Sequence, residues 1–307
     1  MNVAEAPTVV LFSDEPGWHG RVLRRELENR GVASVVCSLR ECALDLSGDD
    51  PKIVIPGIED LPAAAFVRGV PGGSLEEIIL RLNVLHALSD LGIPVMNSGR
   101  AIERTVDKSL TTFLLRRHGL PTPRTWVCES RQHAGEIAAR VFADGDELVV
   151  KPMFGSQGTG VCKVANATEF ANHEAHAGVY YLQEYLPESD GYHRDWRIFV
   201  IGGQAVAGME RRSSHWVTNR AQGADCVPFA PDRTLYRLAE RAAAAVEVDY
   251  AGVDILRDRS GRWLVGEVNG IPAWQGLQRV SGSDITHAIV DNFYAKIARQ
   301  SLSMAAP

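Results

Sequence analysis

The stretch Gly-Val-Asp-Ile-Leu-Arg-Asp-Arg-Ser-Gly-Arg-Trp-Leu-Val-Gly-Glu-Val-Asn, residues 252–269, contains two apolar runs separated by Ser260-Gly261. Apolar runs divided by such a dipeptide predict a β-hairpin. A two-residue turn at this position would pair Arg259 with Arg262. The register of the whole hairpin then follows from the turn, so the sequence predicts which side chains face each other.

This register brings two acidic side chains together. Counting back from the turn places Asp254 opposite Glu267, and Asn269 shares a face with Glu267 because side chains alternate along a strand. Like charges directly opposite each other are destabilising, so a neutralising partner is expected. Two carboxylates and an amide oxygen suit a hard divalent cation, usually Mg²⁺ where phosphates are present. The alternative is an ordinary hairpin whose polar face is solvated.

Length and composition limit the class of protein. A chain of 307 residues suggests one large domain or two to three small ones, and 45% hydrophobic with 23% charged residues is typical of globular proteins. The net charge of −6 argues against a nucleic-acid partner. The sequence shows no bilayer-spanning run, no signal-peptide pattern, and five scattered cysteines without metal-site spacing. These features predict a cytoplasmic protein with no membrane partner.

The first hundred residues alternate between strand and helix patterns. Apolar, β-branched runs predict strands at 8–12, 33–37 and 52–55. Helical spacing predicts helices at 21–30 and 75–91. This alternation predicts a small α/β domain with a parallel sheet. No Gly-x-Gly-x-x-Gly follows the first strand, so a dinucleotide site is not expected there.

A glycine-rich loop is expected between two strands in the middle of the chain. The apolar run 147–151 ends at Lys151, and Gly155-Ser156-Gln157-Gly158-Thr159-Gly160 follows before a second strand at 161–164. Glycine has no Cβ, so backbone N–H groups of such a loop can approach a phosphate closely. No Gly-Lys-Ser/Thr follows, so this is not a Walker loop. The alternative is a flexible hairpin turn, but three glycines beside Lys151 favour phosphate binding.

The remaining segments add helices and polar strands. Helical patterns cover residues 109–118, 131–142, 235–248 and 285–298. A strand at 195–201 would carry Asp195 and Arg197 on one face, because they lie two residues apart. The segment Glu210-Arg211-Arg212 taken alone is best explained as a solvated strand end, and residues 213–219 are rich in hydrogen-bonding side chains.

In this order and spacing, the segments resemble the ATP-grasp carboxylate–amine ligases, particularly the RimK- and LysX-like group. The resemblance extends from Asp107-Lys108 to residues 281–285 and covers most of the chain. It implies an α/β (α+β) fold in three parts: an N-terminal parallel α/β domain at 1–100, and two α+β subdomains at 101–187 and 188–307 that hold ATP between them. It also implies that ATP phosphorylates a carboxylate, and that an amine attacks the acyl phosphate to give an amide.

The resemblance implies a role for each candidate residue. Lys108 and Lys151 would contact phosphates, and the 155–160 loop would close over them. The other nucleotide ligands would be Glu184, Tyr185, Leu186, Asp195 and Arg197. Asp254, Glu267 and Asn269 would hold one or two Mg²⁺ ions, with Mn²⁺ as a substitute. Arg211 would stabilise the acyl phosphate, with adjacent Arg212 as the alternate, and Asn219 would lie near the metal or the carboxylate.

The substrate is left open because the loop 270–276 departs from the RimK-like and LysX-like patterns, and this loop faces the acceptor in the family. The variant resembles ligases that add glutamate to a small cofactor of the tetrahydromethanopterin or methanofuran type; protein or peptide glutamylation also fits. The expected partners are a small-molecule or peptide carboxylate and an amino acid, with L-glutamate near Arg220 or Arg279, in a homo-oligomer. The alternatives are a non-catalytic ATP-binding regulatory protein of this fold, and a kinase for a small acid.

Overall fold

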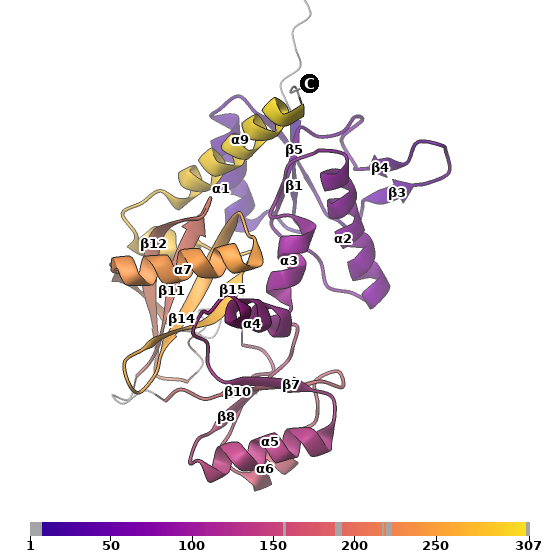
Figure 1. Ribbon diagram of the computed structural model, residues 1–307. Coiled ribbons are helices and arrows are strands. Elements are labelled where there is room, and N and C mark those ends of the chain that lie inside the picture. The colour runs from indigo at the N-terminus through magenta and orange to yellow at the C-terminus, as the bar shows by residue number, and fades with distance from the viewer. Residues whose placement is uncertain (1–7, 156–157, 188–191, 217, 219–222, 305–307) are drawn as a thin grey trace, which may run out of the picture.

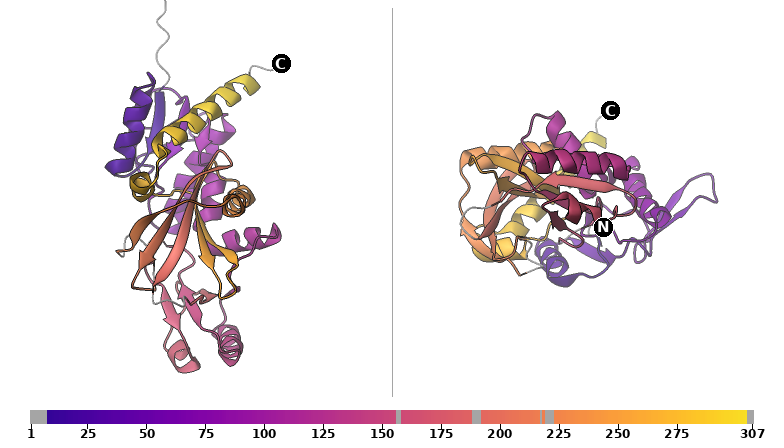
Figure 2. Two further views of the ribbon diagram at one scale, coloured as in Figure 1. Left: turned by 90° about the vertical axis from the view of Figure 1, so that its left-hand side faces the viewer. Right: turned by 90° about the horizontal axis from the view of Figure 1, so that it is seen from below.

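The computed structural model describes residues 8–155, 158–187, 192–216, 218 and 223–304. The strands form an N-terminal sheet, a middle sheet and a larger third sheet, with one small hairpin beside the first (Figure 1). The N-terminal sheet and the middle sheet lie at opposite ends of the molecule, with the third sheet between them (Figures 1 and 2). Among the described helices, none is long and apolar enough to cross a membrane.

The N-terminal sheet is parallel, as predicted, and its strand order is β2-β1-β5-β6. The strands are β1 (Thr8–Phe12), β2 (Ala33–Cys37), β5 (Ala64–Val67) and β6 (Val95–Met96). The helices beside it are α1 (Gly17–Glu28) and α2 (Leu75–Asp90).

The prediction that residues 52–55 belong to this sheet is wrong. β4 (Lys52–Val54) instead pairs antiparallel with β3 (Ala43–Asp45) in a separate hairpin. Its Lys52 and Val54 side chains are exposed, whereas an interior strand of a parallel sheet is buried on both faces. β5, which is buried throughout, occupies the place next to β1.

The middle sheet is antiparallel and presents one face to the third sheet. It contains β7 (Thr125–Cys128), β10 (Tyr180–Glu184), β8 (Leu148–Lys151) and β9 (Cys162–Val164), in that order. α5 (Arg131–Ala143) and α6 (Ala167–Ala171) cover its other face (Figure 1). The predicted strand–loop–strand around Lys151 is therefore present as β8 and β9.

The third sheet is antiparallel, and α7 (Arg233–Val246) covers one of its faces. Its strands are β13 (Asp225–Phe229), β12 (Gln204–Ser213), β11 (His193–Ile201), β14 (Tyr250–Arg257) and β15 (Trp263–Asn269), in that order. α3 (Gly99–Val106) and α4 (Lys108–Arg117) connect the N-terminal sheet to the middle sheet. α8 (Gln275–Val280) and α9 (Ile285–Met304) follow β15.

The β14–β15 hairpin has the predicted pairing of Asp254 with Glu267, but it reaches this pairing by a different route. The predicted Arg259–Arg262 pair is wrong, because the last pair before the turn is Arg257 with Trp263. This longer turn displaces the register by one residue, and an irregularity after Asp254 restores it. Gly266 lies at that point, where a Cβ would come 3.1 Å from Leu256 Cδ1, so the close approach favours glycine.

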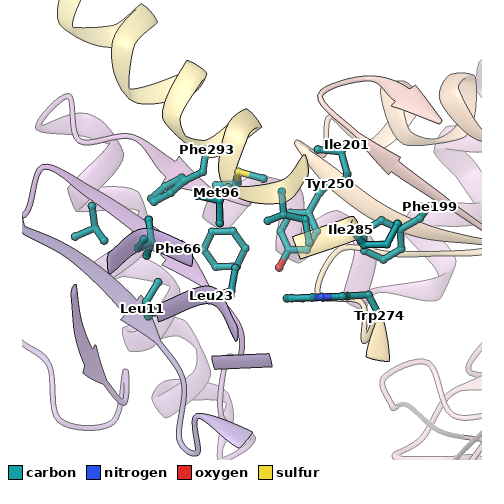
Figure 3. Packing of buried hydrophobic residues seen from close by; sticks show 14 of the residues in the cluster. Leu11, Leu23, Phe66, Met96, Phe199, Ile201, Tyr250, Trp274, Ile285 and Phe293 are labelled. Carbon is teal, nitrogen blue, oxygen red and sulfur yellow. The ribbon is translucent and has the colours of Figure 1, made fainter. Parts of the chain in front are cut away.

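A shared core fixes the N-terminal domain against the third sheet. Phe66 of β5, Tyr250 of β14, Trp274 and Phe293 of α9 belong to one buried cluster (Figure 3). The ring centroids of Phe66 and Tyr250 are 5.3 Å apart, and those of Phe66 and Phe293 are 5.5 Å apart. This packing holds the carboxyl ends of the N-terminal strands beside the loop that follows β15.

Candidate active site

A pocket lies between the middle sheet and the face of the third sheet that α7 leaves uncovered. Most of the described candidate residues line it: Lys108, Lys151, Gly155, Gly158, Thr159, Glu184, Tyr185, Leu186, Asp195, Arg197, Arg211, Asp254, Glu267 and Asn269. Gly160 and Arg212 are not among the lining residues. Ser156, Gln157, Asn219 and Arg220 lie outside the described residues. The fold therefore brings candidate residues from several separate segments of the sequence together in one pocket.

Two lysines converge beside the glycine-rich loop. Lys151 Nζ, at the end of β8, donates a hydrogen bond to Gln183 Oε1 at 2.7 Å. Burial lowers the pKa of Lys151 to about 8, although Glu267 and Asp254 act in the opposite direction. Lys108 Nζ, at the start of α4, donates to Gly155 O at 2.6 Å and lies 3.8 Å from Glu267 Oε1. The pair forms a positive end of the pocket that suits phosphate oxygens.

Asp254 is held by two arginines from neighbouring strands. Arg197 Nε and Nη2 donate to its two carboxylate oxygens, each at 2.7 Å, and Arg211 Nη2 donates to Oδ2 at 2.9 Å. Burial alone would raise the pKa of Asp254, but Arg197 and Arg211 outweigh it and lower the pKa to about 2. The repulsion expected between Asp254 and Glu267 is therefore relieved by the two arginines and by Lys108.

The donor set nevertheless fits a divalent cation. Asn269 Nδ2 lies 3.4 Å from Asp254 Oδ2, so the amide and the carboxylates of Asp254 and Glu267 converge. These are hard oxygen donors, which Mg²⁺ prefers. Within the described residues no group of three His, Cys, Asp or Glu side chains could hold a metal, so such a site needs the amide oxygen of Asn269. A cation would also have to compete with Arg197 and Arg211 for Asp254.

Of the two adjacent arginines, Arg211 is the one inside the pocket. Arg211 Nε donates to Asp195, its partner across β11 and β12, and the side chain is only 5% exposed. Arg212 is 46% exposed and pairs with Glu210. Asp195 also accepts a hydrogen bond from Thr218. The predicted nucleotide ligand Asp195 is thus engaged with Arg211, and it can position that guanidinium for a reacting group.

Comparison with known proteins identifies the family. The RimK-like ATP-grasp domain matches residues 105–293, which is more than half of the chain. The chain belongs to the RimK-like ATP-grasp family. The tetrahydromethanopterin:alpha-L-glutamate ligase of Methanococcus maripaludis is 32% identical over 300 residues, which cover 93% of this chain and 98% of that protein.

Further relatives agree in class and fold. The alpha-aminoadipate–LysW ligase LysX of Saccharolobus solfataricus is 30% identical over 233 residues, covering 70% of this chain and 82% of that protein. The structure of the ATP-grasp ligase PsnB, complexed with minimal precursor, Mg and ADP, has a TM-score of 0.71 at 23% identity, covering 95% of this chain and 98% of that chain. The predicted family, fold class and reaction class are confirmed: this protein is an ATP-dependent carboxylate–amine ligase.

The part of the ligase pocket that contains the predicted nucleotide ligands Glu184 and Tyr185 has partners that the sequence did not indicate. Glu184 Oε2 accepts hydrogen bonds from the backbone N and the Nε of Arg124, at 3.3 and 3.1 Å. The Tyr185 ring lies edge-on to Trp216, with centroids 6.0 Å apart, and Lys163 Nζ lies 4.7 Å from the Tyr185 centroid. Arg124 comes from a segment without a recognisable motif. Trp216 lies in the segment 213–219, which the sequence distinguished only by its hydrogen-bonding side chains, so the fold was needed to place both residues here.

Proposed function

We propose that this RimK-like ligase joins the amino group of L-glutamate to a carboxylate of a small molecule or peptide. The observation that supports it most strongly is the convergence of Lys108, Lys151 and Arg211 around the Asp254–Glu267 pair. Phosphoryl transfer requires positioning and charge neutralisation more than covalent help, and this pocket supplies both. In the proposed arrangement Asp254, Glu267 and Asn269 hold one or two Mg²⁺ ions, which Mn²⁺ can replace.

The proposed reaction has two steps. An oxygen of the acceptor carboxylate attacks the γ-phosphorus of ATP, the new O–P bond forms, and ADP leaves. The amine then attacks the acyl carbon, the C–N bond forms, and phosphate departs with the original carboxylate oxygen while the nitrogen loses a proton. Lys108 and Lys151 bind phosphate oxygens as point charges, and Arg211 stabilises the acyl phosphate and the following oxyanion. Bound Mg²⁺ would neutralise charge on the β- and γ-phosphate oxygens.

The choice of glutamate rests on the relatives and on charge. The curated relative from Methanococcus maripaludis is named an alpha-L-glutamate ligase. Glutamate carries a second carboxylate, which requires a cationic partner near the acceptor site. Arg279 of α8 is exposed and has no carboxylate partner within the described part of the chain, which makes it a candidate. Arg220 is the other candidate, and it lies outside the described residues.

The test is the amine dependence of ATP hydrolysis. The protein is incubated with Mg²⁺-ATP, candidate acceptors, and either L-glutamate or its neutral analogue L-glutamine. We expect ADP and amide in equal amounts, with a rate that is about tenfold or more higher for glutamate, because one charge-assisted hydrogen bond contributes about 1.5–3 kcal/mol. Equal rates with both amino acids would contradict the choice of glutamate. ADP release that needs no amine would instead indicate a kinase.

We also propose that the ligase is a cytoplasmic homo-oligomer. Leu75, Ile79 and Leu80 of α2 are 70%, 46% and 46% exposed, and such neighbouring apolar side chains on one helix suit a subunit interface. All five cysteines are free thiols, which fits a reducing compartment that also supplies ATP.

A further inference from the structure

Arg68 lies at the point where the strand order of the N-terminal sheet reverses. From β1 the chain continues to β2 on one side, whereas β5 lies on the other side of β1. Arg68 directly follows β5, and its backbone N–H donates to Phe12 O at the end of β1, at 2.8 Å. In open α/β sheets, ligands bind in the crevice outside the carboxyl ends of the strands at such a point. Arg68 therefore occupies the position at which sheets of this type bind small ligands.

The charge of Arg68 is not compensated within the described residues. Its Nη1 donates to Pro272 O at 3.0 Å and to Tyr250 OH at 3.4 Å, and its guanidinium carbon lies 4.8 Å from the Trp274 ring centroid. Tyr250 and Trp274 belong to the buried cluster drawn in Figure 3. Its Nε is buried without a hydrogen-bond partner, and no described carboxylate lies within ion-pair distance. A half-buried guanidinium without an anion is unfavourable, so a bound anion would stabilise it.

The first turn of α1 adds hydrogen-bond donors beside this arginine. The helix begins at Gly17 without a side-chain cap and without an acidic residue in its first turn, so its first N–H groups are not capped by a side chain. In the loop before it, Asp14 accepts a hydrogen bond from Ser38 and Glu15 is exposed. The positive end of the helix dipole reinforces the preference of this position for a negative group.

His19 contributes a further donor. Its Nε2 accepts hydrogen bonds from the backbone N–H groups of Trp274 and Gln275, at 3.1 and 3.3 Å, so the ring proton is on Nδ1. The described residues supply no acceptor for that Nδ1–H. Burial and the charge of Arg68 lower the pKa of His19 to about 4, so the ring is neutral at pH 7. The donors of His19 and α1 and the charge of Arg68 together suit a carboxylate.

This group of donors adjoins the reaction centre. A Cβ on Gly252 would lie 3.1 Å from Pro272 Cβ and 3.3 Å from Arg197 Cδ, so Pro272 separates Arg68 from Arg197. Arg197 holds Asp254. Arg68 is therefore next to the Asp254 network, on the side of the N-terminal domain. A ligand there is close enough to be part of a substrate, but its anion is distinct from the carboxylate that Arg211 would stabilise.

We propose that Arg68, with the first turn of α1, binds a non-reacting carboxylate of the amino-acid substrate and thereby selects an acidic amino acid. This inference rests on the proposed function, because it assumes that the amine substrate is an amino acid. Arg68 acts here as a specificity-determining residue. It takes no part in phosphoryl transfer, so ATP binding does not depend on it.

The test compares binding of L-glutamate and L-glutamine by calorimetry, with Mg²⁺ and a non-hydrolysable ATP analogue present. Arg68→Gln keeps an N–H donor for Pro272 O but removes the charge. Arg68→Lys keeps the charge but lacks the planar guanidinium group with its several N–H donors. We expect Arg68→Gln to weaken glutamate binding about tenfold or more and to leave glutamine and nucleotide binding unchanged. Arg68→Lys should lose less. Arg25→Gln, with its exposed side chain in the last turn of α1, is the control and should match the wild type, and Arg279→Gln tests the other candidate residue.

Each outcome decides the inference. Unchanged glutamate affinity in Arg68→Gln overturns it, and so does an equal loss for glutamine, which a merely structural role predicts. A selective loss in Arg279→Gln alone moves the carboxylate site to α8 and overturns it as well. If Arg68→Gln does not fold, wild-type affinity in Arg68→Lys counts against the inference. Wild-type protein that binds glutamate but makes no amide contradicts only the proposed function, whereas absence of glutamate binding contradicts both.

Discussion

Asp254→Asn and Glu267→Gln are each expected to reduce turnover by about 10²-fold or more. Each removes a negatively charged ligand of the proposed Mg²⁺ site, and Mg²⁺ is what would neutralise the transferring phosphoryl group. Their effects on stability should differ. If repulsion between the two carboxylates were the main effect in the metal-free protein, both substitutions would be neutral or stabilising. The structure instead places Asp254 between Arg197 and Arg211, so Asp254→Asn leaves two buried guanidinium groups with less compensation.

The stability of the two variants therefore separates their roles. Breaking a buried ion pair costs about 3–5 kcal/mol, so the metal-free Asp254→Asn protein should melt lower than the wild type. The Glu267 side chain is 35% exposed and lies 3.8 Å from Lys108, so Glu267→Gln should change the free energy of unfolding by less than about 1 kcal/mol. Stabilisation by Mg²⁺-ATP should shrink in both. Asp258→Asn, in the turn of the same hairpin, is the matched control and should keep normal activity.

Near-normal turnover of either variant at saturating Mg²⁺ would contradict the metal assignment. An Asp254→Asn protein that melts at or above the wild-type temperature would contradict the stabilising role of the arginine pairs.

Lys151→Ala is expected to weaken ATP binding by about 10- to 100-fold, because charge-assisted hydrogen bonds contribute about 1.5–3 kcal/mol. The melting temperature should change little, because burial already disfavours the charged lysine and the amine stabilises the ligand-free fold only weakly. Calorimetry with a non-hydrolysable ATP analogue measures the affinity. Lys52→Ala, with its exposed side chain on β4 of the separate hairpin, is the control. Unchanged affinity in Lys151→Ala would show that another residue binds the phosphates.

The same lysine gives ATP binding a pH dependence. Its folded pKa of about 8 lies below the ordinary value of 10.5, so the charged form is penalised in the ligand-free fold below about pH 8, and the penalty fades as pH rises through 10.5. Phosphates favour the charged form and raise the pKa of this lysine in the complex, so binding should take up a proton in the range above about pH 8. Affinity should fall across this range in the wild type, and this fall should be absent in Lys151→Ala.

Strong local patterns predicted several parts of this structure. The apolar runs and turn residues of the Asp254–Glu267 hairpin, and the glycines after Lys151, determine local conformation directly, so they could be recognised in the sequence. The turn itself was predicted too short, and the correct pairing was recovered because Gly266 compensates by one residue. A pairing predicted from a turn therefore also depends on irregularities farther along the strands.

Other features depend on distant segments. β5 is a short run with two alanines, and only its burial beside β1 makes it a central strand. The arginines that hold Asp254 come from β11 and β12, and the pairing of these strands with β14 is a property of the whole sheet. Arg68 follows β5 in a segment without a motif, so its proximity to Trp274 and Pro272 becomes visible only in the folded chain.

The fate of an acceptor oxygen shows directly whether ATP activates the carboxylate by phosphorylation. An acceptor that gives amide with L-glutamate is labelled with ¹⁸O in its carboxylate, and the phosphate released with Mg²⁺-ATP is analysed by mass spectrometry. Formation of an acyl phosphate in this pocket predicts one ¹⁸O atom transferred to phosphate for each amide formed. Phosphate without ¹⁸O, released alongside the same amide, would show that ATP does not activate the carboxylate by phosphorylation, and would contradict the proposed acyl-phosphate mechanism.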